Sequence, residues 1–133
     1  MQKNKSLATL LAFLLGGAGL HRFYLYGKKD VWAWLHLASL PLSGLGLLLL
    51  PGLDPYFPCL PLSLSVLAAW VETLVIGLTP DAAWDAKMGN AQPSDTRWPI
   101  AVLLVLTLGV GATGLIWTIA RLFDLLYTGG AYG

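Results

Sequence analysis

Four long stretches of the sequence contain no Asp, Glu, Lys or Arg, and they restrict the possible fold more than any other feature. Several of them approach the ~20 apolar residues that a helix needs to cross a bilayer. The chain of 133 residues is 56% hydrophobic with a mean hydropathy of +0.68, so it is far more apolar than a soluble globular domain. We therefore predict an all-α integral membrane protein with a single domain over residues 1–133. The uncharged stretches are residues 6–20, 31–53, 55–71 and 98–120.

Three segments are predicted to span the membrane as helices, and they cover residues 30–50, 60–78 and 99–127. Prolines punctuate the connections between them, as expected where such helices meet water. The first apolar segment, residues 6–20, has two interpretations. It either crosses the membrane or forms a re-entrant or tilted half-helix that turns at its pair of glycines, so we expect three to four hydrophobic helices in a multi-pass protein.

The distribution of Lys and Arg predicts which connections face the cytoplasm. Residues 20–29 contain three basic residues and residues 79–98 contain two, whereas the connection 52–60 contains none. By the positive-inside rule, the first two connections are cytoplasmic. The same rule favours the half-helix form of the first segment, because Lys3 and Lys5 then lie on the cytoplasmic side as well.

The stretch GGAGLHRFYLYG resembles the signature of the TM2 domain family, in which a Gly-rich apolar helix runs into an H-R-F-Y-L-G-like turn. The stretch TPDAAWDAKMGN is similar to a connection in a bacterial branch of TM2-containing proteins, and GLIWTIARLFDLL resembles the closing helix of the family with its aspartate, here Asp124. The resemblance implies a bacterial inner-membrane protein and supplies no reaction. The signature residues present are Gly16, Gly17, Gly19, His21, Arg22, Phe23, Tyr24, Leu25 and Gly27. In this view the domain consists of the TM2-like motif 3–30, central helices 30–78, a connection 79–98 and a last helix 99–127.

Glu72 is predicted to lie at membrane depth. It precedes Pro80 by eight residues, which is about 12 Å along a helix measured from the basic face. An ionisable side chain in hydrocarbon costs roughly 2.5 to 3.5 kcal/mol, so it needs a partner. Our hypothesis is that Arg22 reaches Glu72, with His21 hydrogen-bonded nearby, and so locks the first segment onto the third. Two alternatives remain open: Arg22 snorkels to headgroup phosphates while Glu72 meets a serine or a water, or these groups form a proton or ion relay.

The remaining polar residues in apolar segments receive structural interpretations. Arg121 and Asp124 are three residues apart on the last helix, so they can pair, and we expect a solvated interfacial pair. His36 is predicted to be a packed core histidine. We expect no metal site and no cofactor, because His21 lies fifteen residues from His36 and neither has a neighbouring cysteine.

Residues 109–114, GVGATG, match the letters of the G-x-G-x-x-G dinucleotide-binding fingerprint. That fingerprint requires a preceding strand and a following helix, whereas these residues fall inside a predicted spanning helix. Small residues in such a helix let another backbone approach closely. Gly109, Gly111 and Gly114 are therefore predicted to serve helix packing or self-association, and the glycines of the TM2-like motif are predicted to serve packing too.

The sequence favours an interaction protein over an enzyme. We find no nucleophile with a base, no phosphate loop and no metal cluster, and the acidic residues of the connection 79–98 are expected to be solvated. A net charge of +1 without a basic cluster argues against nucleic acid. The leading prediction is a non-enzymatic interaction or assembly protein of the bacterial inner membrane, in contact with lipid and with a second copy or another membrane protein. The alternative is an oligomeric transporter or channel component for ions or small solutes, since Glu72, His21 and Arg22 are able to line a polar path.

Overall fold

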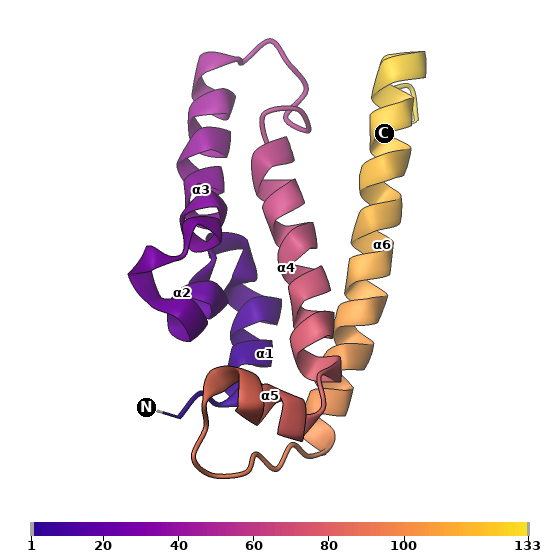
Figure 1. Ribbon diagram of the computed structural model, residues 1–133. Coiled ribbons are helices and arrows are strands. Elements are labelled where there is room, and N and C mark those ends of the chain that lie inside the picture. The colour runs from indigo at the N-terminus through magenta and orange to yellow at the C-terminus, as the bar shows by residue number, and fades with distance from the viewer. Residues whose placement is uncertain (1, 133) are drawn as a thin grey trace.

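Three long helices run side by side in the computed structural model, which describes residues 2–132 (Figure 1). They are α3 (Val31–Leu49), α4 (Leu60–Leu78) and α6 (Trp98–Thr128), and each is long and apolar enough to cross a membrane. Among the described residues every regular element is helical. The predicted all-α fold with three spanning helices is therefore confirmed, and the predicted boundaries agree with these to within one residue at each end.

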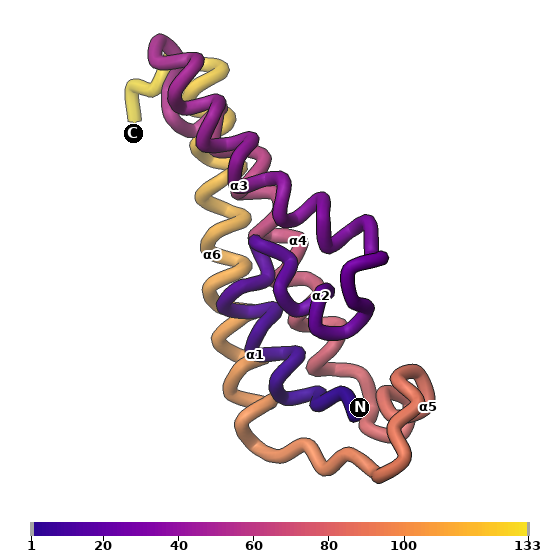
Figure 2. Tube along the Cα trace, turned by 90° about the vertical axis from the view of Figure 1, so that its left-hand side faces the viewer, coloured from indigo at the N-terminus to yellow at the C-terminus, as the bar shows by residue number. Residues whose placement is uncertain are grey.

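The first apolar segment forms a short hairpin that extends along only part of the length of the long helices (Figures 1 and 2). Helix α1 (Lys5–Leu15) has 11 residues, which is about 16 Å against the ~30 Å of a hydrocarbon core. The turn η1 (Gly16–Ala18) then leads into α2 (Leu20–Tyr26), and η2 (Gly27–Lys29) joins α2 to α3. Of the two interpretations of residues 6–20, the half-helix is the one that the structure adopts.

Glycines let the turn of this hairpin sit directly on its neighbours. A Cβ at Gly16 would lie 2.5 Å from the Cβ of Ala69, and a Cβ at Gly17 would lie 2.7 Å from Cγ2 of Val66, both on α4. Gly19 has a φ of +77°, and its Cβ would lie 2.6 Å from the carbonyl oxygen of Ala33 on α3. The hairpin therefore packs against two long helices at distances that only glycine permits.

The glycines of α6 divide into two kinds. A Cβ at Gly114 would lie 2.9 Å from Cζ3 of Trp70 on α4, and a Cβ at Gly111 would lie 3.7 Å from the same ring. The indole N–H of Trp70 donates to the carbonyl of Phe13, 3.2 Å away, so this ring also ties α1 to the α4–α6 pair. Gly109, in contrast, has no neighbouring atom of the described chain within 4 Å of a Cβ at its position. Two of the three predicted packing glycines therefore serve packing within the chain.

The connection between α4 and α6 is folded, whereas the sequence suggested a solvated loop. It contains α5 (Asp81–Met88), which lies across the end of the molecule where the N-terminus is found (Figures 1 and 2). Trp84 is 2% exposed, and its indole N–H donates to the carbonyl of Lys3 at 3.1 Å. The side chain of Asn90 accepts from the N–H of Lys3 at 2.9 Å and donates to its carbonyl at 3.1 Å. The connection therefore docks onto the N-terminal residues through buried contacts that the sequence pattern does not reveal.

The acidic residues of this connection hold its backbone in place. Asp81 accepts hydrogen bonds from the hydroxyl and the N–H of Thr96, at 2.6 and 2.9 Å, and from the Lys5 ammonium at 3.0 Å. The Thr96 hydrogen bonds and the Lys5 charge lower the pKa of Asp81 to about 2. Asp85 accepts from Ser94 and from the Asn90 amide. Asp81 and Asp85 are therefore structural partners, whereas Asp95, whose side chain is 74% exposed, is solvated as expected.

Candidate functional site

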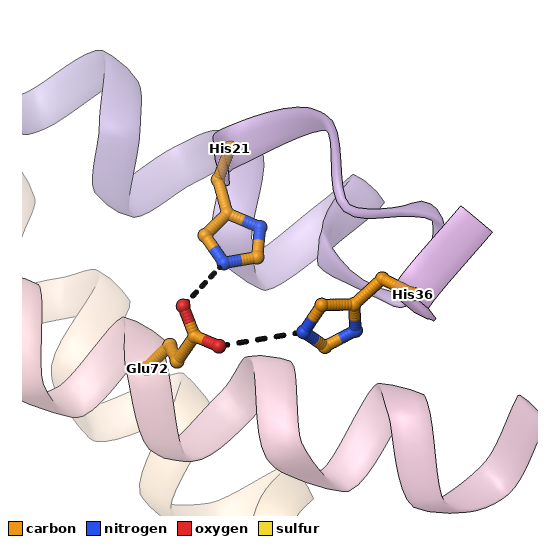
Figure 3. Close-up of side chains that lie close together, drawn as sticks. All are labelled: His21, His36 and Glu72. Carbon is orange, nitrogen blue, oxygen red and sulfur yellow. Dashed lines mark hydrogen bonds and ion pairs between the residues drawn. The ribbon is translucent and has the colours of Figure 1, made fainter. Parts of the chain in front are cut away.

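The carboxylate of Glu72 is the centre of a polar cluster where α2, α3 and α4 meet (Figure 3). Its Oε2 lies 2.8 Å from Nε2 of His21 and 2.8 Å from Nη1 of Arg22. Its Oε1 lies 3.3 Å from Nε2 of His36. The expected pairing of Arg22 with Glu72 is therefore present, with His21 beside it as the hypothesis required. Snorkelling of Arg22 away from Glu72 does not describe this geometry.

Arg22 bridges Glu72 to the start of α3. Its Nε lies 2.6 Å from Oδ2 of Asp30 and its Nη2 lies 3.3 Å from Oδ1 of the same carboxylate. Asp30 is the N-cap of α3, and its Oδ2 also accepts the N–H of Ala33 at 3.1 Å. The side-chain hydrogen bond from Arg22 holds the pKa of Asp30 below its ordinary value. One guanidinium thus joins a carboxylate at a helix N-terminus to a carboxylate in the middle of a neighbouring helix.

His36 belongs to the cluster through a chain of hydrogen bonds. Its Nδ1 lies 2.6 Å from the hydroxyl of Ser65 on α4, and that hydroxyl donates to the carbonyl of Gly17 at 2.7 Å. The rings of His21 and His36 also meet edge to face, with centroids 5.7 Å apart. His36 is buried, as predicted for a packed core histidine, and the polar partners of both its nitrogens are contacts that the sequence did not predict.

The sequence contains a second signal for the burial of His36, in addition to its position in an apolar helix. His36, Ser39 and Ser43 are spaced three and four residues apart on α3, and all three are buried. In an apolar helix, such a polar stripe marks the side that faces other helices, since polar groups avoid lipid. The stripe therefore predicts that His36 faces the interior of the bundle.

The aromatic residues of the TM2-like motif position the N-terminal segment. The Tyr24 hydroxyl accepts the N–H of Asn4 at 2.9 Å, and its backbone carbonyl accepts the Lys3 ammonium at 2.7 Å. The Phe23 ring packs edge to face on Trp34, with centroids 5.2 Å apart. These contacts hold the first residues of the chain and the start of α3 against α2.

A second ionic cluster lies at the other end of the long helices. Arg121 donates to Asp124 at 2.6 Å, as expected for residues three apart on a helix, and also to Asp54 at 3.0 Å. Asp54 comes from the connection between α3 and α4, so this arginine links that connection to α6. The Tyr56 hydroxyl strengthens the same link by donating to the carbonyl of Thr118 at 2.7 Å. The expected pair is present, but its side chains are only 17% and 11% exposed, so the expectation of a solvated pair is wrong. The second carboxylate was not predicted.

The fold and these clusters define a helical membrane protein whose short N-terminal hairpin is bound by an ionic cluster to its long apolar helices. The family model described as TM2 domain matches residues 1–50. The chain therefore contains a TM2 domain, which begins with the hairpin and ends on α3, and the resemblance found in the sequence is confirmed there. Glu72, all of α5 and all of α6 lie outside the matched residues. No curated protein and no solved structure matches the chain.

The chemistry available at Glu72 is that of a coordinating or charge-holding site. Nitrogen atoms of His21 and His36 and a carboxylate oxygen of Glu72 all lie within 4.8 Å of one another. The two histidines are fifteen residues apart in the sequence, and the hairpin brings their side chains together in space, so this separation does not exclude a metal site. The side chain of His21 is fully buried, whereas that of Glu72 is 28% exposed. The cluster is thus enclosed on the side of His21 and partly exposed on the side of Glu72.

Proposed function

We propose that the protein is a non-enzymatic interaction or assembly protein of the bacterial inner membrane, and that its partner is a second copy of the chain. The observation that carries this proposal is the outward face of α6. Gly109 and Thr113 lie four residues apart there and are both exposed, and the Thr113 hydroxyl is turned back onto the Gly109 carbonyl at 2.8 Å. A small residue every fourth position lets a second helix approach closely in lipid.

The surroundings of this face support the same proposal. A shallow hollow of about 460 Å³ lies beside it, lined by Trp70, Gly109, Val110, Thr113, Gly114 and Trp117. Of the 31 residues of α6, Ile100 and Thr107 are the buried ones. Lipid alone is able to cover an apolar helix, so exposure by itself does not indicate a partner. The small residues do, because they make little contact with lipid and let another helix pack closely.

The proposed orientation places the connections 20–29 and 79–98 in the cytoplasm. The hairpin brings the N-terminus to the same end as both connections, so the basic residues gather there. At the other end, Arg121 is held between two carboxylates. This asymmetry fits the positive-inside rule. The basic residues at the proposed cytoplasmic end are Lys3, Lys5, Arg22, Lys28, Lys29, Lys87 and Arg97.

Gly109→Leu is expected to break the assembly while leaving the protomer folded, because this side chain meets open space within the chain. The matched control is Gly44→Leu on α3, where a side chain also meets open space. The mass of the intact particle, measured in lipid discs, should show an oligomer for the parent and for Gly44→Leu, and a monomer for Gly109→Leu. A monomeric parent, or a Gly109→Leu protein that assembles normally, would reject the proposal.

Thiol labelling in intact cells is expected to distinguish the two ends of the molecule. In a Cys59→Ser background, which removes the single cysteine of the chain, Gly52→Cys should react with a membrane-impermeant maleimide. Ala91→Cys should react only after the membrane is permeabilised. Both positions are exposed, so the difference reports sidedness. The reverse pattern would invert the proposed topology.

A second candidate function, a component of an ion or small-solute transporter, is favoured by the partly exposed Glu72 carboxylate among two histidines and an arginine. Ionisable groups inside a membrane commonly mark such pathways. If this candidate is right, proteoliposomes containing the parent should carry a proton or cation flux that Glu72→Gln abolishes. Equal leakage in empty vesicles and in both protein preparations would dismiss it.

A further inference from the structure

We propose that His21, His36 and Glu72 form a binding site for a divalent transition-metal ion of the Zn²⁺ class. The three side chains come from α2, α3 and α4, and the Glu72 carboxylate lies between the two imidazole rings with one oxygen toward each (Figure 3). Two imidazole nitrogens and a carboxylate oxygen are ligands that suit zinc and its neighbours in the first transition row, and they do not suit Mg²⁺ or Ca²⁺. The proposal is independent of the assembly function, since no residue of the Gly109 face takes part.

The hydrogen bonds of His36 determine which of its ring nitrogens carries the hydrogen and which is free to bind a metal. The Ser65 hydroxyl has one hydrogen, which it donates to the Gly17 carbonyl at 2.7 Å. Its oxygen therefore accepts from His36, whose Nδ1 at 2.6 Å must carry the ring hydrogen. In neutral His36 this leaves a lone pair on Nε2, which faces Oε1 of Glu72 at 3.3 Å. Two acceptors that face each other require a positive charge between them, either a proton or a metal ion.

The distance between these two acceptors favours the metal ion. A proton shared between an imidazolium and a carboxylate draws the heavy atoms to about 2.7–2.9 Å. Ligands on a tetrahedral metal with bonds of about 2.0–2.1 Å lie about 3.3 Å apart. The observed 3.3 Å between His36 Nε2 and Glu72 Oε1 matches the second arrangement. The hydrogen bond from Nδ1 to Ser65 is also the kind of contact that orients a metal-binding histidine.

His21 supplies the third ligand. Its Nε2 lies 2.8 Å from Oε2 of Glu72 and belongs to a set of ligand atoms within 4.8 Å of one another, so a small shift brings it to the ligand spacing of a tetrahedral site. Its Nδ1 is buried and has no hydrogen-bond partner among the described residues. At 2.8 Å, Oε2 of Glu72 accepts the Nε2 hydrogen in the metal-free state, and a metal at Nε2 requires the tautomer in which Nδ1 carries that hydrogen. The partial exposure of the Glu72 side chain allows water or an exogenous ligand to take the fourth position.

Charge balance allows a cation here despite the adjacent arginine. The guanidinium of Arg22 lies 2.6 Å from the Asp30 carboxylate, and this pair is neutral as a unit. With neutral histidines, the Glu72 carboxylate then leaves the cluster with one net negative charge. Binding of a divalent ion changes the net charge of the cluster from about −1 to about +1. Water at the exposed side of Glu72 screens this charge. Arg22 retains Oε2 of Glu72, and the metal takes Oε1.

A metal in this position would bind the hairpin to both neighbouring spanning helices. It would bind the folded state only, because the unfolded chain does not bring the three ligands together, and it would therefore raise the unfolding temperature. Within this view Ser65 is a positioning residue, since it acts through the His36 ring and does not touch the metal.

The test is metal binding by the full chain in lipid discs, purified without a polyhistidine tag so that His21 and His36 remain its only histidines. After metal removal and equilibrium dialysis against micromolar Zn²⁺, the parent and Cys59→Ser should each retain about one zinc ion per chain. His36→Gln should bind at least about tenfold more weakly, and Ser65→Ala should bind roughly 10- to 100-fold more weakly. Ser39→Ala is the matched serine control, because Ser39 donates to backbone carbonyls and not to an imidazole, and it should bind like the parent.

A parent that retains no zinc would overturn the proposal and would leave a proton between His36 and Glu72. Zinc binding that is unchanged in His36→Gln would overturn it as well. If His36→Gln does not fold, X-ray absorption of the zinc-loaded parent decides the matter: a shell containing two imidazoles supports the site, and a shell without them rejects it. The unfolding temperature of the parent should rise on addition of Zn²⁺, and that of Glu72→Gln should not.

Discussion

Gly19→Ala is expected to destabilise the protein by roughly 2 to 5 kcal/mol, the sum of a left-handed backbone cost and the cost of overpacking. The φ of +77° at Gly19 is unfavourable for alanine, and the new methyl carbon would lie 2.6 Å from the carbonyl oxygen of Ala33. A backbone carbonyl within a helix is unable to move aside as a flexible side chain does. The turn of the hairpin therefore has to separate from α3, and the unfolding free energy in mixed micelles should fall accordingly.

Gly89→Ala is the matched control for this experiment. Gly89 has a similar φ of +67°, and a Cβ there meets no described atom within 4 Å. Gly89→Ala should lower the free energy of unfolding only by the cost of the left-handed backbone conformation, about 1 to 2 kcal/mol. The difference between the two variants isolates the contact of the hairpin with α3. Equal losses for Gly19→Ala and Gly89→Ala would mean that the hairpin is not seated as described.

Glu72→Ala is expected to cost about 3 kcal/mol or more, because it leaves the buried His21 ring and the Arg22 guanidinium without their shared acceptor. The side chains of Arg22 and Glu72 are 18% and 28% exposed, so water compensates them only in part. The comparison variant is Asp95→Ala, which removes an ion pair with Arg97 whose partners are 74% and 76% exposed. That loss should stay below about 1 kcal/mol. Unfolding free energies in mixed micelles measure both variants.

A double-mutant cycle separates the pair from its surroundings. Arg22→Ala, Glu72→Ala and the double variant should give a coupling free energy of roughly 0.5 to 3 kcal/mol. Asp30 remains as a partner for Arg22 in the Glu72 variant, which lowers the expected coupling below that of an isolated buried pair. Strictly additive losses would show that Arg22 and Glu72 stabilise the fold independently.

The spanning helices were predictable because their signals are local. A run without charges, ended by proline or by polar residues, specifies a membrane helix without reference to any other part of the chain. The contact between Arg22 and Glu72 was predictable for a related reason, since a carboxylate at membrane depth needs a partner and few cations reach that depth. The half-helix followed from the positions of Lys3 and Lys5 combined with the same rule of charge.

The contacts that escaped prediction depend on how one helix is rotated and shifted against another. Whether His36 meets Ser65 and Glu72 is decided by the seating of α3 on α4, which the glycines of the hairpin turn control. The second partner of Arg121, Asp54, depends on the path of the connection between α3 and α4. Neither relation has a fixed spacing in the sequence. The burial of Trp84 likewise depends on the contact of α5 with the N-terminal residues, which are distant in the sequence.

The spanning helices differ in length, and lipids next to them should respond to that difference. Helices α3 and α4 have 19 residues each, or about 28 Å, whereas the uncharged part of α6, residues 98–120, is about 34 Å long. A hydrocarbon core of about 30 Å is slightly too thick for the first two and slightly too thin for the third. The acyl chains beside α6 should therefore be stretched and those beside α3 compressed, so that a single protomer creates a thickness gradient in its lipid annulus. Pairing of two α6 helices would bury the stretched side and relieve the larger mismatch.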